Sequence, residues 1–353
     1  MKIVTIVGAR PQFIKAAVVS RELRKIHTEI LVHTGQHYDR EMSDIFFSQL
    51  DIPDPDYNLG IGSASHCKQT GQMLSAIEDV LLEEKPDWVL VYGDTNSTLA
   101  GALAAAKLHI KVAHVEAGLR SFIRDMPEEI NRVLTDHLSD LLFCPSHSAV
   151  DNLLAEGITE GVHLVGDVMY DALLSARSRG KENDETILSK YSLQPGSYLL
   201  VTVHRAGNTD DSQRLESILK ALNALDEGVI WPIHPRAQQK LEENGWQPGE
   251  HIQIIDPVGY FEMLSLEANA RRILTDSGGI QKEAYWLGVP CITLRDETEW
   301  VETVQGGRNI LAGADTEEIC RAVGQWEPVN QPPTIYGDGD ASYKIFSLLN
   351  SKQ

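Results

Sequence analysis

Short runs of apolar, often β-branched residues alternate with segments of helical periodicity along the whole chain. Nearly continuous apolar runs predict strands that are buried on both faces, as in parallel sheets, whereas a strand with one wet face would alternate apolar and polar residues. Between the runs, apolar residues recur at helical spacing, for example at Leu215, Ile218 and Leu222 and across residues 42–50. The expected strands are residues 2–7, 29–33, 87–92, 111–115, 141–144, 198–203, 229–233, 252–255, 272–275 and 290–294.

Alternating strands and helices predict right-handed β–α–β crossovers, which leave either one eight-stranded barrel or two doubly wound sheets. The weakly hydrophobic residues 175–197 favour a break in the middle. We therefore expect an α/β protein with two Rossmann-like, doubly wound parallel-sheet domains that face a central cleft and present the carboxyl ends of their strands to it. The expected domains are residues 1–167 and 168–335, followed by a helix within 336–353 that packs on the first domain and is capped by Asp338 or Asp340.

Composition and charge narrow the class of function. At 353 residues and 42% hydrophobic content, the chain is long enough for two cores. Its net charge of −20 argues against nucleic acids and anionic membranes as partners. A small anionic substrate remains compatible, because a few local cations and helix N-termini suffice to bind it. The first apolar run is too short for a signal peptide and no run spans a membrane, so we expect a cytoplasmic protein.

The cysteines and short motifs give no indication of a metal or a common nucleotide loop. Cys144 and Cys291 fall in strand-like runs, where buried reduced thiols are expected. We find no HExxH motif, no Cys/His metal spacing, no Walker A motif and no GxGxxG fingerprint. The sequence therefore predicts no bound metal.

The stretch TDSGGIQKEA, residues 275–284, places Ser277, Gly278 and Gly279 at the mouth of a predicted helix. A helix N-terminus has unpaired N–H groups and a partial positive charge, so it can bind phosphate oxygens, and glycines let the ligand approach closely. Glu283, one turn inside, could accept the hydroxyls of a ribose. The structural alternative is a tight turn in which Ser277 only caps the helix.

Polar residues also follow the predicted strands of the first half. Arg10 and Lys15 come after the first strand, where they could contact a phosphate or a sugar. Asp94 and Glu116 each end an apolar strand, and carboxylates beside buried strands are costly unless they are paired or used. The structural alternative for Glu116 is an ion pair with Arg120.

Glu128, His204 and His234 complete this set of candidates. Glu128 and Arg132 are four residues apart on one predicted helical face, while Glu129 is expected to point elsewhere, so an ion pair between the first two is the structural alternative. In the second half, His204 and His234 leave two successive strands beside arginines. Paired histidines in that position suit an anionic ligand.

The full set of motifs has a family counterpart. In chain order they are GARPQFIK, YGDTNSTLAG, HVEAGLRS, MPEEINR, VTVHRAGN, PIHPR, DPVGY, LTDSGGIQKEA and YGDGDAS. Together they closely resemble the non-hydrolysing UDP-N-acetylglucosamine 2-epimerases over nearly the whole chain. The resemblance implies two Rossmann-like domains in the GT-B arrangement, usually as a homodimer. It also implies interconversion of UDP-GlcNAc and UDP-ManNAc without NAD or metal, supplying precursor for surface polysaccharides.

The resemblance also implies roles for individual residues. The family's catalytic groups match Asp94, Glu116, Glu128 and His204. Its nucleotide contacts match Arg10, His234, Ser277, Gly278, Gly279 and Glu283, with Lys15 near the sugar–phosphate. The implied reaction eliminates UDP across C1–C2 to a 2-acetamidoglucal and adds it back with the C2 proton on the other face.

One departure from the family pattern bears on the sugar. Many members have TERPE where this chain has TEWVE, so Trp300 replaces an arginine that contacts UDP. This feature and the GARPQFIK variant resemble the branch that acts on UDP-2,3-diacetamido-2,3-dideoxy-glucuronate. A GT-B glycosyltransferase and a non-catalytic UDP-sugar sensor are further alternatives. The acids Asp94, Glu116 and Glu128 argue against a sensor, which has no need of them.

Overall fold

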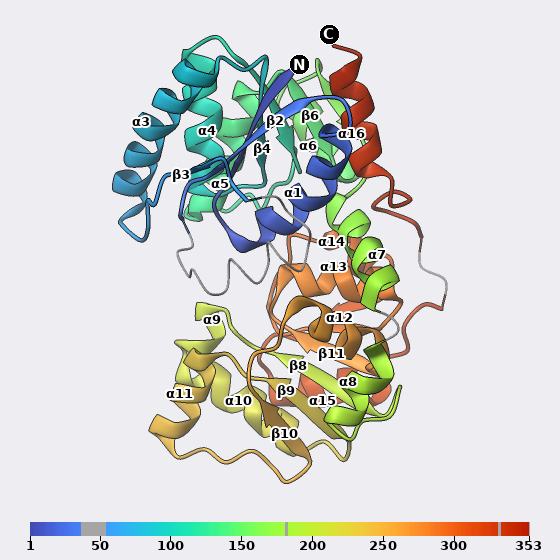
Figure 1. The fold of residues 1–353 in the computed structure, drawn as a ribbon. Coiled ribbons are helices and arrows are strands. Elements are labelled where there is room, and N and C mark those ends of the chain that lie inside the picture. Colours follow the sequence, from blue (N-terminus) through green and yellow to red (C-terminus); the bar gives the residue numbers. More distant parts are fainter. Residues whose placement is uncertain (37–53, 181–182, 331–332, 353) are drawn as a thin grey trace. The chain divides into compact units, whose positions relative to one another are not determined.

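The computed structural model describes residues 1–36, 54–180, 183–330 and 333–352. The chain forms two compact units (Figure 1): unit 1 comprises Met1–Leu174 with Thr334–Gln353, and unit 2 comprises Ser175–Pro333. The predicted helical segment at residues 42–50 lies outside the described residues.

Unit 1 contains, within its described residues, a parallel sheet of seven strands in the order β3-β2-β1-β4-β5-β6-β7. The strands are β1 Lys2–Val7, β2 Thr28–His33, β3 Tyr57–Asn58, β4 Trp88–Tyr92, β5 Lys111–Val115, β6 Leu141–Cys144 and β7 Val162–Leu164. The helices are α1 Arg10–Leu23, α3 His66–Glu84, α4 Asn96–Lys107, α5 Pro127–Leu138, α6 His147–Ala155, α7 Val168–Gly180 and α16 Ala341–Asn350, of which α7 continues into unit 2.

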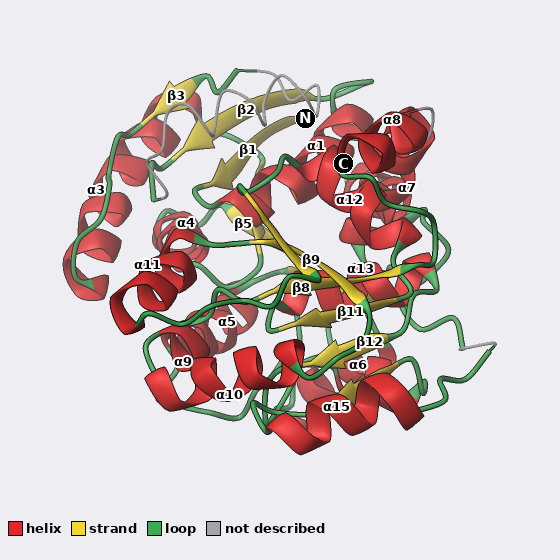
Figure 2. Cartoon of the chain, turned by 90° about the horizontal axis from the view of Figure 1, so that it is seen from below, coloured by secondary structure: helices red, strands yellow, loops and turns green. Residues whose placement is uncertain are grey.

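Unit 2 repeats this plan with six described parallel strands in the order β10-β9-β8-β11-β12-β13. The strands are β8 Tyr198–Thr202, β9 Gly228–Pro232, β10 Ile252–Ile255, β11 Arg272–Thr275, β12 Cys291–Thr293 and β13 Asn309–Leu311. The helices, shown in red in Figure 2, are α8 Asp184–Lys190, α9 Ala206–Thr209, α10 Ser212–Asn223, α11 Pro235–Asn244, α12 Tyr260–Asn269, α13 Gly278–Leu287, α14 Val301–Gln305 and α15 Thr316–Gln325.

Burial on both faces explains the apolar strand sequences. Along β8, Leu199 and Val201 belong to one core cluster, whereas Tyr198 and Leu200 belong to another. Because successive side chains of a strand point to opposite faces, the two clusters lie on the two faces of the sheet. The predicted class, two doubly wound parallel sheets, is confirmed.

The strands absent from the sequence-based prediction are, among the described residues, β3, β7 and β13, and each is the edge strand of its sheet. They have only two or three residues, too few to show a periodic pattern.

The thiols of Cys144 and Cys291 are buried and free, and burial raises the pKa of each to about 12.

In each sheet the chain order reverses beside its first strand, between β1 and β4 in unit 1 and between β8 and β11 in unit 2. The helices that follow these neighbouring strands leave on opposite faces, so the carboxyl ends of the strands open a crevice between them. The loops after these four strands are therefore where a ligand is expected.

The C-terminal helix α16 packs against α1 of the same unit. Its Ile345 and Leu349 are buried, and the ring of Phe346 lies 5.8 Å from that of His27. Asp340 is the residue before the helix, but its side chain makes no capping hydrogen bond. The predicted cap is therefore wrong in its residue, because a carboxylate from α7 takes this role.

That carboxylate belongs to Asp171. It accepts hydrogen bonds from the backbone N–H of Ala341 at 3.2 Å and of Ser342 at 2.7 Å, and from the hydroxyl of Ser342 at 2.6 Å. It therefore joins the start of α16 to α7.

No helix in the described ranges is both long and apolar enough to cross a membrane.

We expect Asp171→Ala to lower the free energy of unfolding by about 1–3 kcal/mol, because two N–H groups at the start of α16 lose their acceptor in a buried place. Denaturant unfolding and amide hydrogen exchange across 341–350 measure this effect. Ser342→Ala is the matched control, since it keeps both backbone bonds, and its loss should be smaller. Equal losses for the two variants would contradict this account of Asp171.

Candidate active site

A single glutamine ties together the two loops at the reversal of strand order in unit 1. The Gln12 side-chain oxygen accepts the N–H groups of Gly8 and Ala9 at 2.8 and 3.0 Å, just after β1. Its nitrogen donates to the carbonyl of Tyr92 at 2.6 Å and to the hydroxyl of Thr95 at 3.0 Å, at the end of β4. Gln12 is 2% exposed and positions both loops. Gln12 was not among the residues predicted from the sequence.

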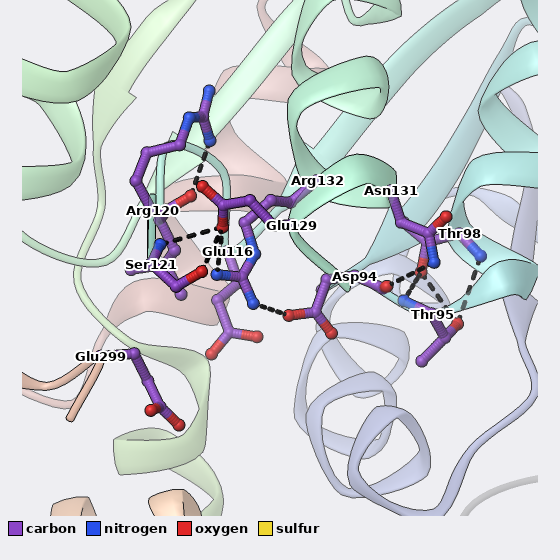
Figure 3. A network of polar contacts seen from close by, with 12 residues as sticks. Asp94, Thr95, Thr98, Glu116, Arg120, Ser121, Glu129, Asn131, Arg132 and Glu299 are labelled. Atoms are coloured by element: carbon purple, nitrogen blue, oxygen red, sulfur yellow. Dashed lines mark hydrogen bonds and ion pairs between the residues drawn. The ribbon is translucent and has the colours of Figure 1, made fainter. Parts of the chain in front are cut away.

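Next to this junction, Arg132 of α5 connects two carboxylates (Figure 3). It forms an ion pair with Asp94, which follows β4, and donates to Glu129 at 3.0 Å. Glu129 also accepts the N–H groups of Ser121 and Phe122, both at 2.9 Å. Burial alone would raise the pKa of Glu129, but these hydrogen bonds and the charge of Arg132 lower it.

These contacts correct the expectation for the start of α5. Glu129 is buried and points into the network, whereas Glu128 is exposed at the first turn. The ion pair offered as the structural alternative for Glu128 is therefore wrong, because Arg132 binds Glu129 one residue later. Helical spacing predicted the wrong partner for Arg132 because the backbone of residues 121–122, which precede the helix, binds the Glu129 carboxylate.

Glu116 follows β5 in a left-handed backbone conformation, with φ of 73°. Such a φ is uncommon for a residue other than glycine and costs about 1–3 kcal/mol, so it occurs mostly where the surrounding structure enforces it. Its carboxylate forms a buried ion pair with Lys15 of α1. Both groups lie close to Gly93, where an added Cβ would stand 3.4 Å from Glu116 Oε2 and 3.6 Å from Lys15 Nζ.

Arg120 does not pair with Glu116, so that structural alternative is wrong as well. Arg120 instead binds Asp136 at 2.7 Å and makes a bidentate pair with Glu156, also at 2.7 Å. Asp136 contacts His114 at 2.7 Å, and the other ring nitrogen of His114 lies 2.7 Å from the carbonyl oxygen of Gly93. This series of linked polar side chains ends at the carbonyl of Gly93 and so supports the turn that carries Asp94.

Asp136 is 1% exposed, yet it remains acidic. Burial would raise its pKa, but the hydrogen bond from His114 and the charge of Arg120 lower it. Arg10, the remaining candidate in unit 1, begins α1 beside the end of β1, and its side chain lies outside the described part.

In unit 2 a buried aspartate holds the loop that carries His204. Asp276, directly after β11, is 0% exposed. Its oxygens accept the N–H of His204 at 3.1 Å, the N–H of Arg205 at 3.0 Å and the side-chain nitrogen of Asn208 at 3.1 Å. Asp276 lies inside the TDSGG motif but was not among the residues predicted from the sequence.

The two predicted histidines do come together. The rings of His204 and His234 have their centroids 6.2 Å apart, and both side chains reach solvent. His234 also caps α11, since its Nδ1 accepts the N–H of Arg236 at 3.2 Å. Burial is the main cause that lowers the pKa of each histidine, so burial favours the neutral form of both rings.

The start of α13 explains why two glycines follow Ser277. Ser277 caps the helix by accepting the N–H of Ile280 at 3.4 Å, as the structural alternative supposed. A Cβ on Gly278 would stand 2.5 Å from an oxygen of Glu299, so the chain itself occupies that side. On Gly279 an added Cβ would meet only the Ser277 hydroxyl, at 3.8 Å, and the residue is exposed. The helix start therefore remains accessible at Gly279.

Trp300, the residue that bears on the identity of the sugar, has a defined neighbour of its own. Its indole ring is buried, and the ammonium group of Lys282 lies 3.8 Å from the ring centroid. A desolvated cation over an indole face is stabilised by about 2 kcal/mol. Lys282 of α13 therefore places a positive charge beside the Trp300 ring.

Glu283 is buried on the same helix. Glu267 of α12 is fully buried nearby, and neither of its oxygens has a hydrogen-bonding partner among the described residues. Burial, and next the charge of Glu283, raise the pKa of Glu267 well above its ordinary value of 4.5. Burial therefore favours the neutral, protonated form of Glu267. In the described ranges no group of three or more His, Cys, Asp or Glu side chains is arranged to hold a metal ion.

We expect Glu267→Gln to flatten part of the pH dependence of stability. An acid whose folded-state pKa is raised stabilises the fold fully below its unfolded pKa, near 4.5, and loses that contribution as the pH rises toward the folded pKa. The free energy of unfolding of the variant, relative to that of the parent protein, should therefore rise by more than about 1 kcal/mol from pH 5 to pH 8. Urea unfolding at both pH values measures the gain.

The exposed Glu250 provides the matched control. Glu250→Gln should leave the difference between pH 5 and pH 8 as it is in the parent protein. A gain for Glu267→Gln that is the same at both pH values would show that Glu267 is ionised in the fold.

Comparison with known proteins places these features in one family. The family model for UDP-N-acetylglucosamine 2-epimerase matches residues 21–350. A UDP-N-acetylglucosamine 2-epimerase homolog of Methanococcus maripaludis is 55% identical, over 99% of this chain and 100% of its own length. The UDP-2,3-diacetamido-2,3-dideoxy-D-glucuronate 2-epimerase of Pseudomonas aeruginosa is 51% identical, over 99% of each chain. The crystal structure of Methanocaldococcus jannaschii UDP-GlcNAc 2-epimerase in complex with UDP-GlcNAc and UDP superposes with a TM-score of 0.91 at 47% identity, covering 99% of this chain and 100% of that one.

Proposed function

The chain belongs to the UDP-N-acetylglucosamine 2-epimerase family, and we propose that it interconverts UDP-GlcNAc and UDP-ManNAc by inverting C2 of the sugar. It is an enzyme, an epimerase acting on a UDP-sugar. The observation that carries the choice of substrate is the 47% identical structure that contains UDP-GlcNAc and UDP.

In this proposal unit 2 binds the nucleotide. The diphosphate lies against the start of α13, where Ser277, Gly278 and Gly279 provide N–H groups and the partial positive charge of a helix N-terminus. The accessible backbone of Gly279 supports this role. Glu283 accepts the ribose hydroxyls and His234 adds a further contact to the nucleotide. From the family motif, Arg10 contacts the nucleotide as well, and Lys15 lies near the sugar–phosphate.

Unit 1 supplies the acids. The C2 proton of an N-acetylhexosamine is hard to remove, because no neighbouring carbonyl acidifies it. In the proposed reaction a base takes this proton, the C1–oxygen bond breaks, UDP leaves with the electron pair, and a double bond forms between C1 and C2. UDP then adds back to C1 of this 2-acetamidoglucal while a proton reaches the other face of C2.

The arrangement of charges in unit 1 supports this chemistry. Proton transfer at two faces of one carbon requires two groups, or one group and a moved substrate, and we assign these transfers to Asp94, Glu116 and Glu128. Asp94 and Glu116 lie at adjacent strand ends, each beside a cation that fixes its position. Carboxylates also suit the positive charge that develops at C1. His204 stabilises the diphosphate as it leaves.

A second candidate substrate is UDP-2,3-diacetamido-2,3-dideoxy-glucuronate, favoured by the 51% identity to the Pseudomonas aeruginosa enzyme that acts on it and by Trp300. The reaction at C2 would be the same. The family resemblance further supports a cytoplasmic homodimer that supplies a precursor for surface polysaccharides. A UDP-sugar sensor would leave the acids of unit 1 without a role.

The proposal is tested by incubating the protein with UDP-GlcNAc and, side by side, with the diacetamido uronate nucleotide in D₂O. We expect deuterium at C2 and a mixture of the two C2 epimers, followed by NMR, because reprotonation uses a group in exchange with solvent. Deuterium that appears at C2 of the uronate nucleotide alone would show that this nucleotide, and not UDP-GlcNAc, is the substrate. No exchange with either would contradict the proposed reaction, and release of free sugar would indicate hydrolysis.

For Asp94→Asn we expect kcat to fall by roughly 10²–10⁴ while the affinity for UDP stays within a few-fold, since the change removes a proton-transfer group from unit 1 and leaves unit 2 intact. Steady-state kinetics and UDP titration measure both quantities. Asp87→Asn is the matched control, because Asp87 precedes the same strand at its opposite end and accepts the N–H of Lys2. A variant at Asp94 with near-normal turnover would remove this residue from the mechanism.

A further inference from the structure

Asp276 is buried between the two loops at the reversal of strand order in unit 2. It follows β11 and binds three groups: the N–H of His204 and the N–H of Arg205, which lie on the loop after β8, and the side-chain nitrogen of Asn208 in α9. With 0% exposure it accepts all of these hydrogen bonds away from water. The carboxylate therefore determines where the His204 backbone lies.

The same carboxylate also faces the imidazole ring. Nδ1 of His204 lies 3.5 Å from Oδ1 of Asp276. A carboxylate beside Nδ1 favours the tautomer with its proton on that nitrogen, which leaves Nε2 to meet a ligand. Of the His204 side chain, 42% is exposed, so the ring has an approach from solvent.

Three charged or titratable groups face this ring in the described part of the chain. Asp276 comes from the end of β11, Arg205 from the same loop, and His234 from the start of α11. Burial lowers the pKa of His204 most, Arg205 and His234 lower it further, and the charge of Asp276 opposes them. Without the carboxylate, the ring would be still harder to protonate.

We propose that Asp276 is the positioning residue of His204: it keeps Nδ1 protonated so that Nε2 faces the ligand, and it stabilises the positive charge that the ring carries once Nε2 has taken a proton from solvent and donates it to the diphosphate. The residue after it is Ser277, so one side chain aligns the histidine with the helix start that binds the phosphates. This inference rests on the proposed function, which assigns His204 to the leaving diphosphate.

The first test uses the unaltered protein and needs no substrate. Long-range ¹⁵N–¹H correlation NMR reports the tautomer of each histidine, and His204→Gln identifies the resonance of His204. We expect the Nδ1–H tautomer for His204 at pH 8. An Nε2–H tautomer would overturn the proposal even if the protein proved to be an active epimerase. The expected tautomer in a protein without epimerase activity would leave the pairing intact and overturn only the proposed function.

The second test is a double-mutant cycle. Asp276→Asn should lower kcat by roughly 10²–10⁴ with little change in the Kd of UDP, and the same substitution in a His204→Gln background should cost almost nothing more. A comparable further loss in that background would show that Asp276 acts only on the fold. Asp276→Asn should also lower the pKa at which His204 titrates, and a pKa equal to or above that of the parent protein would contradict the inference.

A structural control separates support of the loop from support of the ring. Asn208 donates to Asp276 and to the carbonyl of Leu294 at 2.8 Å, and no contact between Asn208 and His204 is seen in the described structure. Asn208→Ala should therefore lower the melting temperature while the Nδ1–H tautomer of His204 persists. A tautomer that changes in Asn208→Ala as it does in Asp276→Asn would reduce the role of Asp276 to loop stability.

Discussion

The constraint on which both halves of this molecule depend is the reversal of strand order in a parallel sheet. Helices that leave neighbouring strands in opposite directions cannot cover the strand ends, so backbone N–H groups there must find other acceptors. Each sheet meets this need with one buried side chain that joins the loops of its two central strands. Gln12 does so between β1 and β4, and Asp276 does so between β8 and β11.

The two units differ in the chemistry of the side chain that joins their loops. Gln12 is neutral and only connects, whereas Asp276 brings a negative charge under the loop that carries His204. In unit 1 the charges lie beside the junction, in pairs and chains such as Lys15 with Glu116 and Arg132 with Asp94. Burying ions is costly unless each has partners with good geometry, and such partners hold the acids in one arrangement.

Sequence patterns were sufficient for the fold class and for the places where polar residues gather, and insufficient for their partners. Long apolar runs predicted the central strands because burial on both faces leaves a plain record in the sequence, while edge strands such as β13 are too short to do so. Arg120 and Arg132 were assigned the wrong neighbours. Spacing along a helix says which residues share a face, but a loop folded over that face, here residues 121–122, decides which one is held. The roles of the candidate residues stay predictions.

The division of the chain has a consequence for its synthesis. Unit 1 is discontinuous: α16, which packs on α1 and is joined to α7 by Asp171, is translated after all of Ser175–Pro333. At about 5–20 residues per second, the ribosome takes roughly 10–30 s to add that insertion. During this interval the nascent first unit exposes the apolar surface that α16 later covers. Docking of α16 therefore comes late in the completion of unit 1.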